Sequence, residues 1–207
     1  MYKWIMDLIP KIKWHNVKEF FTGRKHDLQS NQIAFAKLCR TMFEIDDAII
    51  LTSDKSSLSS WGVKLLHFLL TGKIANYSHA ILKVDDTYIE AINAGVRYAS
   101  FDEITKCDSL VVLIPKHLKT LNFNEDALAK WEADVIGKNY DIYFELYDRT
   151  NMSCIEVVYD SLKIDGHIDK MDAFKNLLSK SKNLTPQMLR DCKDFKILFE
   201  FNKGNIL

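Results

Sequence analysis

The residues with the clearest chemical meaning lie around Cys154. Ser153 is followed three residues later by Glu156, which is the capping-box pattern that starts a helix. If Ser153 is the cap, Cys154 takes the first helical position, where N–H groups without acceptors and the positive end of the helix dipole surround the sulfur. These surroundings favour the thiolate, and the same N–H groups can receive an oxyanion. The pattern predicts a nucleophilic cysteine.

A structural interpretation of the same cysteine stays open. One face of the predicted helix carries Cys154, Val157, Val158 and Ser161. Free cysteine is among the most buried residue types, so helical spacing also fits a thiol that only packs in the core.

A nucleophilic cysteine needs a base, and the base needs a group that orients it. Two strand-like runs, 79–84 and 87–92, are separated by an Asp-Asp pair. A hairpin closed at that pair places His79 and Glu90 diagonally on one face, where the carboxylate can fix the orientation and tautomer of the ring. A cross-strand pair without catalysis is the alternative. A register shift of one residue would separate the two side chains.

The remaining elements must position these groups. Strands are expected at 48–52, 110–114 and 197–201, and helices over much of 1–45 and at 59–70, 124–136, 154–163, 169–178 and from 185. Ser59 or Ser60 and Asn124 are the expected caps. Strands cluster in the middle and helices flank them, so the predicted fold class is α+β, with a small antiparallel sheet packed with helices.

Composition excludes several function classes. Lysine plus arginine and aspartate plus glutamate both number 28, so the net charge of zero gives no case for a nucleic-acid partner. The four cysteines are widely spaced without a C-x-x-C pair, and the histidines lack ligand spacing. We therefore expect no metal and no cofactor.

The first residues, 1–14, carry no secretory signal because charges interrupt every apolar run. The absence of a signal predicts a cytoplasmic protein, with viral or phage delivery or peripheral membrane attachment as alternatives. The segment mixes tryptophan, isoleucine and leucine with lysine. It therefore fits a terminal helix packed on its own domain or an amphipathic helix on a membrane surface.

Aromatic and acidic residues mix in the stretch 140–148. Asp141 and the acids that follow it are expected in a solvated loop, with a substrate groove as the alternative. Trp61 and Trp131 are expected to anchor the core.

A series of short motifs, taken in order, resembles the permuted branch of the papain-like NlpC-type hydrolases, in particular the YiiX/YebB-like group. In that branch the histidine strand precedes the cysteine helix. The lecithin retinol acyltransferase group is a more distant relative. The motifs are Asp47-Ala48-Ile49-Ile50-Leu51, Ser78-His79-Ala80, Ile89-Glu90-Ala91, Gly95-Val96, Gly137-Lys138-Asn139-Tyr140-Asp141 and Ser153-Cys154-Ile155-Glu156-Val157-Val158.

The resemblance implies roles by position. Cys154 matches the nucleophile, His79 the general base and Glu90 the residue that orients the base. Tyr140 matches a tyrosine near the oxyanion site, and Asp47 matches the acid of a Gly-Asp pair before the first strand.

The resemblance covers residues 46–165 and implies that they form a permuted papain-like catalytic core. Outside it, the sequence pattern predicts a helical N-terminal extension over 1–45, and C-terminal helices and a final strand that pack on the core over 166–207. The chain departs from the family pattern at two positions. Asp46 stands where glycine is usual, and Ile155 stands where a small polar residue is common. Neither departure removes a reacting group.

Together these features predict a cysteine-dependent hydrolase that cleaves an amide bond of a peptide or acyl substrate, cell-wall peptide included, through a thioacyl intermediate. A lipid-directed thiol acyltransferase or esterase is one alternative, suggested by residues 1–14 and the distant acyltransferase resemblance. A non-catalytic interaction module on the same fold is the other.

Overall fold

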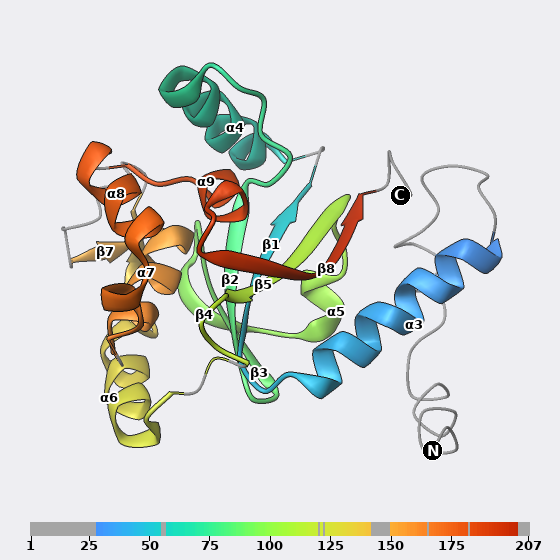
Figure 1. Cartoon of the computed structure of the whole chain (residues 1–207), viewed down its shortest axis with the longest axis horizontal. Helices are drawn as coiled ribbons and strands as arrows, with labels where there is room; N and C mark the ends of the chain where they lie inside the picture. The colour runs from blue at the N-terminus through green and yellow to red at the C-terminus, as the bar shows by residue number, and fades with distance from the viewer. Residues whose placement is uncertain are drawn as a thin grey trace.

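The computed structural model describes residues 28–54, 57–119, 121, 123–141, 150–164, 166–181 and 183–202. The chain folds as α+β, as predicted. One antiparallel sheet has the strand order β4-β3-β2-β1-β5-β8, and helices pack around it (Figure 1). The expected amphipathic segment 1–14 lies outside the described residues.

The strands of this sheet are β1 (Ala48–Ser53), β2 (His79–Val84), β3 (Thr87–Ile92), β4 (Gly95–Ala99), β5 (Ser109–Pro115) and β8 (Phe195–Asn202). A separate parallel pair joins β6 (Asn139–Tyr140) and β7 (Asn151–Met152). The helices are α3 (Leu28–Glu44), α4 (Leu58–Thr71), α5 (Phe101–Ile104), α6 (Glu125–Val135), α7 (Cys154–Ile164), α8 (Asp172–Lys180), α9 (Pro186–Asp191) and the short 3-10 helix η2 (His167–Lys170).

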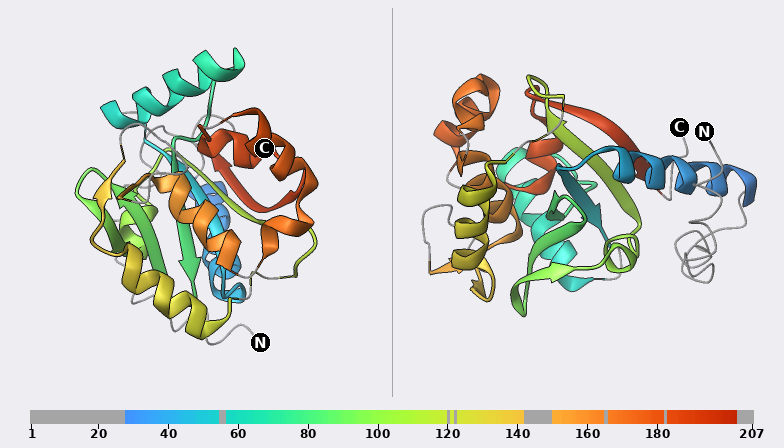
Figure 2. Two further views of the ribbon diagram at one scale, coloured as in Figure 1. Left: turned by 90° about the vertical axis from the view of Figure 1, so that its left-hand side faces the viewer. Right: turned by 90° about the horizontal axis from the view of Figure 1, so that it is seen from below.

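The two central strands are buried along their whole length. Every residue of β1 and of β5 is buried, which suits their continuous apolar sequences. Alternate residues of β1 face two separate cores. Ile49 and Leu51 share one core with α7, and Ile50 shares the other with Leu38 of α3. Figure 2 shows these helices on opposite sides of the sheet.

The C-terminal strand completes the sheet. β8 pairs with β5 along its whole length, with a register shift between Val112 and Leu113. It also lies beside α3, so the two ends of the described chain meet at this edge. Within the described ranges, no helix combines the length and the apolar character needed to cross a membrane.

The β2–β3 hairpin has the register that the sequence predicts. Val84 pairs with Thr87, and Ile81 pairs with Glu90. The connection is a two-residue turn at Asp85 and Asp86, as proposed. The hairpin therefore brings the first residue of β2, His79, diagonally beside Glu90.

This Asp-Asp turn depends on tertiary contacts. Asp85 has a positive φ of 47°, a conformation that side chains disfavour. Its N–H donates to a carboxylate oxygen of Asp47 at 3.1 Å, and its carbonyl accepts from the ammonium of Lys83. Lys83 is buried and also donates to the carbonyls of Ile45 and Asp46, each at 2.7 Å. The segment before β1 thus holds the turn and its register in place.

Three details of the fold differ from the sequence predictions. Trp61 is 65% exposed and is not a core anchor. The cap of α4 is Ser57, whose hydroxyl accepts from the N–H of Ser60, so the helix begins two to three residues earlier than a cap at Ser59 or Ser60 would place it. Strand β4 and helix α5 have no counterpart among the predicted elements. The other cap, Asn124, is confirmed by its side-chain oxygen, which accepts from the N–H of Ala127 at 3.0 Å.

Candidate active site

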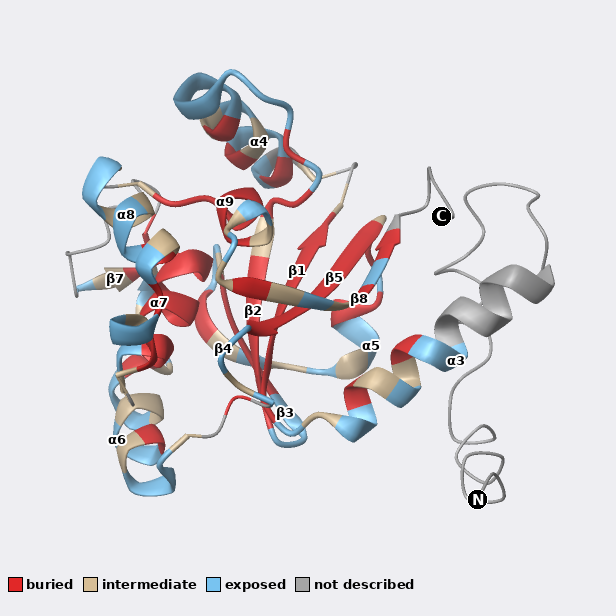
Figure 3. Cartoon of the chain, viewed as in Figure 1, coloured by how far each residue is buried: buried red, intermediate tan, exposed pale blue. Residues whose placement is uncertain are grey.

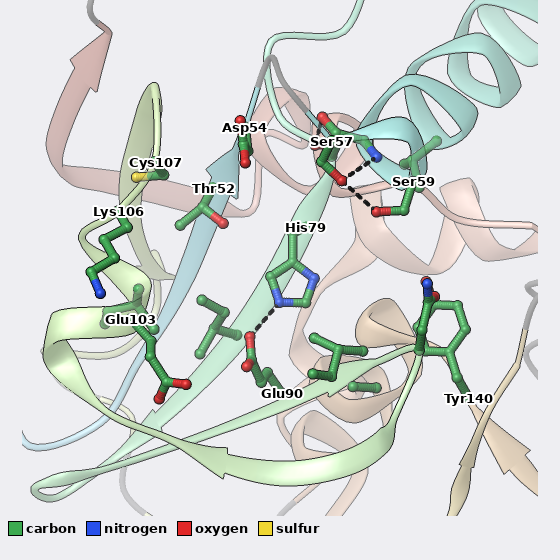
Figure 4. A pocket seen from close by; sticks show the side chains of 18 of the residues that line it. Thr52, Asp54, Ser57, Ser59, His79, Glu90, Glu103, Lys106, Cys107 and Tyr140 are labelled. Atoms are coloured by element: carbon green, nitrogen blue, oxygen red, sulfur yellow. Dashed lines mark hydrogen bonds and ion pairs between the residues drawn. The ribbon is translucent and has the colours of Figure 1, made fainter. Parts of the chain in front are cut away.

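A cavity of about 450 Å³ lies beside the start of β2. Its wall includes His79 and Glu90 from the hairpin, Tyr140 from β6, and Ser57 and Ser59 from the beginning of α4. Figure 4 shows His79 between the two serines above it and Glu90 below it, with Tyr140 to the right of the ring. Three of the four residues predicted for the site therefore line one cavity.

The predicted pair of base and orienting acid is present. Nε2 of His79 lies 2.7 Å from a carboxylate oxygen of Glu90, and Figure 4 draws this contact. Glu90 is buried, whereas the side chain of His79 keeps 24% of its surface exposed. Because Glu90 occupies Nε2, Nδ1 is the ring nitrogen left for a reacting thiol.

Cys154 begins α7 at the predicted first helical position. Burial by itself lowers the pKa of His79, but hydrogen bonds with Cys154 and Glu90, together with the charges of both, raise it to about 10. The sulfur and the imidazole are thus close enough to interact. Cys154 is also only 1% exposed and belongs to the core shared with α7, so the structural interpretation of this cysteine holds as well.

The start of α7 uses Glu156 differently from a full capping box. Its carboxylate accepts from both the N–H of Ser153, at 2.7 Å, and the hydroxyl of Ser153, at 2.8 Å. The Ser153 hydroxyl is therefore a donor here, and the backbone carbonyl of Ser153 accepts from the N–H groups of Glu156 and Val157. This arrangement fixes the residue that immediately precedes the cysteine.

Arg97 is a site residue that sequence reasoning missed. It lies opposite Glu90 in the β3–β4 register and also lines the cavity. Its Nε and Nη2 donate to one oxygen of Glu90, at 3.1 and 2.7 Å, while Nη1 lies 3.0 Å from Glu103. Recognising 95–99 as a strand would have identified Arg97. Once this strand is paired with β3, Arg97 lies opposite the carboxylate of Glu90.

Arg97 and His79 together set the charge of Glu90. Burial by itself raises the pKa of this carboxyl, but the hydrogen bonds and positive charges of His79 and Arg97 outweigh it and hold the pKa below its ordinary value. Glu90 is therefore ionised at neutral pH and bound by two residues, His79 on one oxygen and Arg97 on the other. Such a carboxylate holds the imidazole in a single orientation.

Gly95 explains how Tyr140 reaches the cavity. The N–H of Val96 donates to the carbonyl of Lys138, and the N–H of Gly137 donates to the carbonyl of Val96, both at 2.9 Å. Gly95 has a φ of 105°, and a Cβ there would lie 2.5 Å from the same Lys138 carbonyl. Only glycine allows this close approach, which leads the chain into β6 and Tyr140.

Tyr140 lies among acidic groups. Burial, then the charges of Cys154, Asp141 and Glu156, raise the pKa of Tyr140 well above its ordinary value, so its phenol is a protonated donor at neutral pH. Asp141 is only 3% exposed, so the prediction that it lies in a solvated loop is wrong. The rest of that stretch, 142–149, lies outside the described residues.

Glu156 completes this buried acidic group. Burial raises its pKa to about 7, the two donors on Ser153 oppose that change, and the charge of Asp141 adds to it. Within the described part of the chain, no group of three or more histidine, cysteine or acidic side chains is arranged to hold a metal ion.

Comparisons with known proteins give no family for this chain. A scan against protein-family models finds no match, and a search of curated proteins finds none either. The chemistry of the site must therefore be argued from its own geometry.

Proposed function

We propose that the protein is a cysteine-dependent hydrolase that cleaves an amide bond through a thioacyl intermediate. The observation that carries the proposal is the position of His79, which is bonded to Glu90 at 2.7 Å through Nε2 and interacts with Cys154. A thiol, a base and an orienting acid in this order form the arrangement that activates a nucleophilic cysteine. The order of short motifs that resembles the permuted NlpC-type hydrolases supports the same roles.

In the proposed reaction, His79 holds the proton of the Cys154 thiol before the substrate binds, and the sulfur then attacks the carbonyl carbon. The negative charge on the carbonyl oxygen is stabilised by N–H groups at the start of α7 and by the protonated phenol of Tyr140. His79 then gives its proton to the leaving amine as the C–N bond breaks. Water, deprotonated by His79, attacks the thioester and releases a carboxylic acid and the free thiol.

The burial of Cys154 limits what can react with it. Cys154 is 1% exposed and is not among the residues that line the cavity, whereas His79 and Tyr140 are. These two side chains both interact with Cys154 and form the adjacent part of the wall. The acyl group must therefore reach the sulfur past His79 and Tyr140. This favours a substrate whose carbonyl carries no bulky group at the cleaved bond. Peptides, including cell-wall peptides, present such a carbonyl.

The proposal is tested by labelling with acyl and other activity-based probes, followed by mass spectrometry of the modified peptide. Cys107 is the matched control, because it is also a buried thiol and it lines the cavity. We expect Cys154→Ala and His79→Ala to reduce labelling at least ~1000-fold, and Cys107→Ala to leave it near the wild-type rate.

If the wild type and folded Cys154→Ala are labelled equally, Cys154 is not the nucleophile and the proposal is wrong. Slow labelling of every thiol, at the rate of an ordinary buried cysteine, would instead support a non-catalytic interaction module. Adducts of the reactive protein report the acyl class of its substrate.

A further inference from the structure

Helix α4 carries its apolar residues on the outside. Among the residues of α4 from Ser59 onward, the buried ones are Ser60, Val63 and His67, two of which are polar. Its outward positions include Leu65 at 59% and Leu69 at 72% exposed. A helix on the surface of a globular protein normally shows the reverse arrangement. Figure 3 shows the helix standing out from the body of the molecule, with exposed residues along its length and buried ones where it meets the rest of the fold.

Polar contacts fix this orientation. The hydroxyl of Ser60 lies 2.6 Å from that of Ser78, which precedes β2. Nδ1 of His67 lies 2.8 Å from the hydroxyl of Thr185, and both side chains are buried. Turning α4 to bury its leucines would break both contacts and leave buried polar groups without partners, which is costly. The outward apolar side is therefore a specified feature of the fold.

The exposed apolar side chains form one stripe. Trp61, Leu65, Phe68 and Leu69 follow helical spacing and are all at least half exposed. Beyond the helix, Ile74 is a further exposed apolar residue, at 84%. An apolar surface of this kind marks an interaction site.

The sequence of α4 and its flanks carries lysine and no acid, and on the inner side of the helix the charge of Asp191 of α9 acts on His67. No acidic residue occurs in the sequence between Asp54 and Asp85, while Lys64 and Lys73 lie within and just after the helix. Tryptophan, phenylalanine and leucine on one side with lysine nearby is the composition of helices that lie in a membrane interface. Tryptophan in particular prefers the level of the lipid headgroups.

The size of the stripe also favours a bilayer over a second copy of the chain. A helix of 14 residues is about 21 Å long and about 10 Å across, so one face covers on the order of 200 Å². A stable protein interface covers about 800 Å² on each partner. A single helix face is small for a dimer, but it is enough for an interfacial helix to insert.

We propose that α4 is a docking helix that inserts its apolar stripe into the surface of a bilayer rich in anionic lipid. The first residues of the same helix and its cap line the cavity, so a docked α4 sets the cavity close to the lipid headgroups. Docking does not depend on the proposed hydrolysis. Vesicle binding and probe labelling are separate measurements, and either proposal can fail without the other.

The experiment is flotation of the full chain with vesicles of phosphatidylcholine alone or with 30% phosphatidylserine. The test variant carries Leu65→Gln, Phe68→Gln and Leu69→Gln, since glutamine keeps helix propensity. The control variant carries Phe43→Gln and Ile197→Gln, two exposed apolar residues on other elements. Circular dichroism and urea unfolding establish that both variants are folded.

We expect the wild type and the control variant to bind the phosphatidylserine vesicles, and the test variant to bind at least tenfold more weakly. Binding should weaken without phosphatidylserine and with added salt. Absence of wild-type binding, or equal binding by the test variant, would overturn the proposal; equal binding would indicate that another segment, such as residues 1–14, attaches the chain. If light scattering shows that the wild type is a dimer and the test variant a monomer, the stripe would instead be the interface with a second copy of the chain.

Discussion

The two helices that begin near His79 differ in how they use their apolar residues. Helix α7 buries nearly every side chain from Cys154 to Leu162 and lies against β2 and β3. Helix α4 buries only a narrow stripe and exposes its leucines and aromatics. Both helices begin near one histidine, yet one is held in the core and the other faces outward.

The two helices therefore suit two different tasks: α7 holds a side chain in a fixed position, and α4 presents an apolar surface outside the fold. A sulfur that must meet an imidazole within a fraction of an ångström needs a helix fixed by close packing, which α7 provides. A helix that docks on another surface must keep its apolar side free of the core, which α4 does. The first residues of α4 line the cavity, whereas Cys154 of α7 is linked to it through His79 and Tyr140, so the two helices should respond differently to substitution.

The largest effect on stability is expected from matched leucines in the two helices. Leu162 of α7 is fully buried, so Leu162→Ala should lower the free energy of unfolding by about 2–5 kcal/mol through lost burial and a cavity. Leu69 of α4 is 72% exposed, so Leu69→Ala should change it by less than about 0.5 kcal/mol. Urea unfolding of both variants measures the contrast.

The same pair of variants can break the comparison. A loss for Leu69→Ala as large as that for Leu162→Ala would mean that the outer side of α4 is covered in the folded protein. The face would then belong to the core and would not be available to a bilayer.

A smaller effect is expected from Arg97, which acts on His79 only through Glu90. Arg97→Gln removes two donors from the carboxylate, so the pKa of Glu90 should rise and its hold on the imidazole should weaken. We expect probe labelling of Cys154 to slow roughly tenfold, about 1.4 kcal/mol in activation free energy. The acid limb of its pH profile should also move to higher pH, and Arg97→Lys should restore part of both.

Arg190 supplies the matched control for this prediction. Its Nε and Nη2 donate to the carboxylate of Glu200, at 3.2 and 3.0 Å, in a bidentate ion pair. Glu200 lies on β8, at the opposite edge of the sheet. Arg190→Gln should leave labelling and its pH profile unchanged. If Arg97→Gln slows the labelling of Cys154 without shifting the acid limb of the pH profile, the substitution has loosened β4 in general. The positioning role of Arg97 would then be rejected.

Most of this positioning could be read from the sequence because it is local. The hairpin of β2 and β3 follows from two alternating runs and a two-residue gap, and the register then brings His79 to Glu90. Cys154 at the first position of α7 follows from Ser153 and Glu156. Each inference needs only helix or strand geometry and the chain next to it.

The residues that sequence reasoning missed depend on contacts between distant segments. The Asp-Asp turn was predicted, but it is unfavourable in isolation and is held by Lys83 of β2 and by Asp47, which lies before β1. Trp61 was expected in the core because tryptophan is a large aromatic residue, yet Ser60 and His67 occupy the inner side of α4. Asp141 lies among charged residues in the sequence and is buried by the pairing of β6 with β7.

The last and smallest effect concerns the pH dependence of stability on the α7 side. The raised pKa of His79, about 10 against an ordinary 6.5, means that the folded protein holds a proton that the unfolded chain has lost in this range. Its contribution is therefore complete below about pH 6.5 and is lost as the pH rises through about 10. Since the side chain is 24% exposed, we expect a loss on the order of 1 kcal/mol.

Urea unfolding of wild type and His79→Gln between pH 7 and 10.5 checks this expectation, because the other titrating groups are common to both proteins. Wild type should lose stability more steeply with rising pH, and the two curves should become parallel above pH 10. The triple α4 variant should follow the wild-type slope, since its substitutions lie on the outer side of the helix, away from the imidazole. Parallel curves over the whole range would show that His79 is not held as a cation by Cys154 and Glu90, and the thiol would then lack the charged partner that distinguishes α7 from α4.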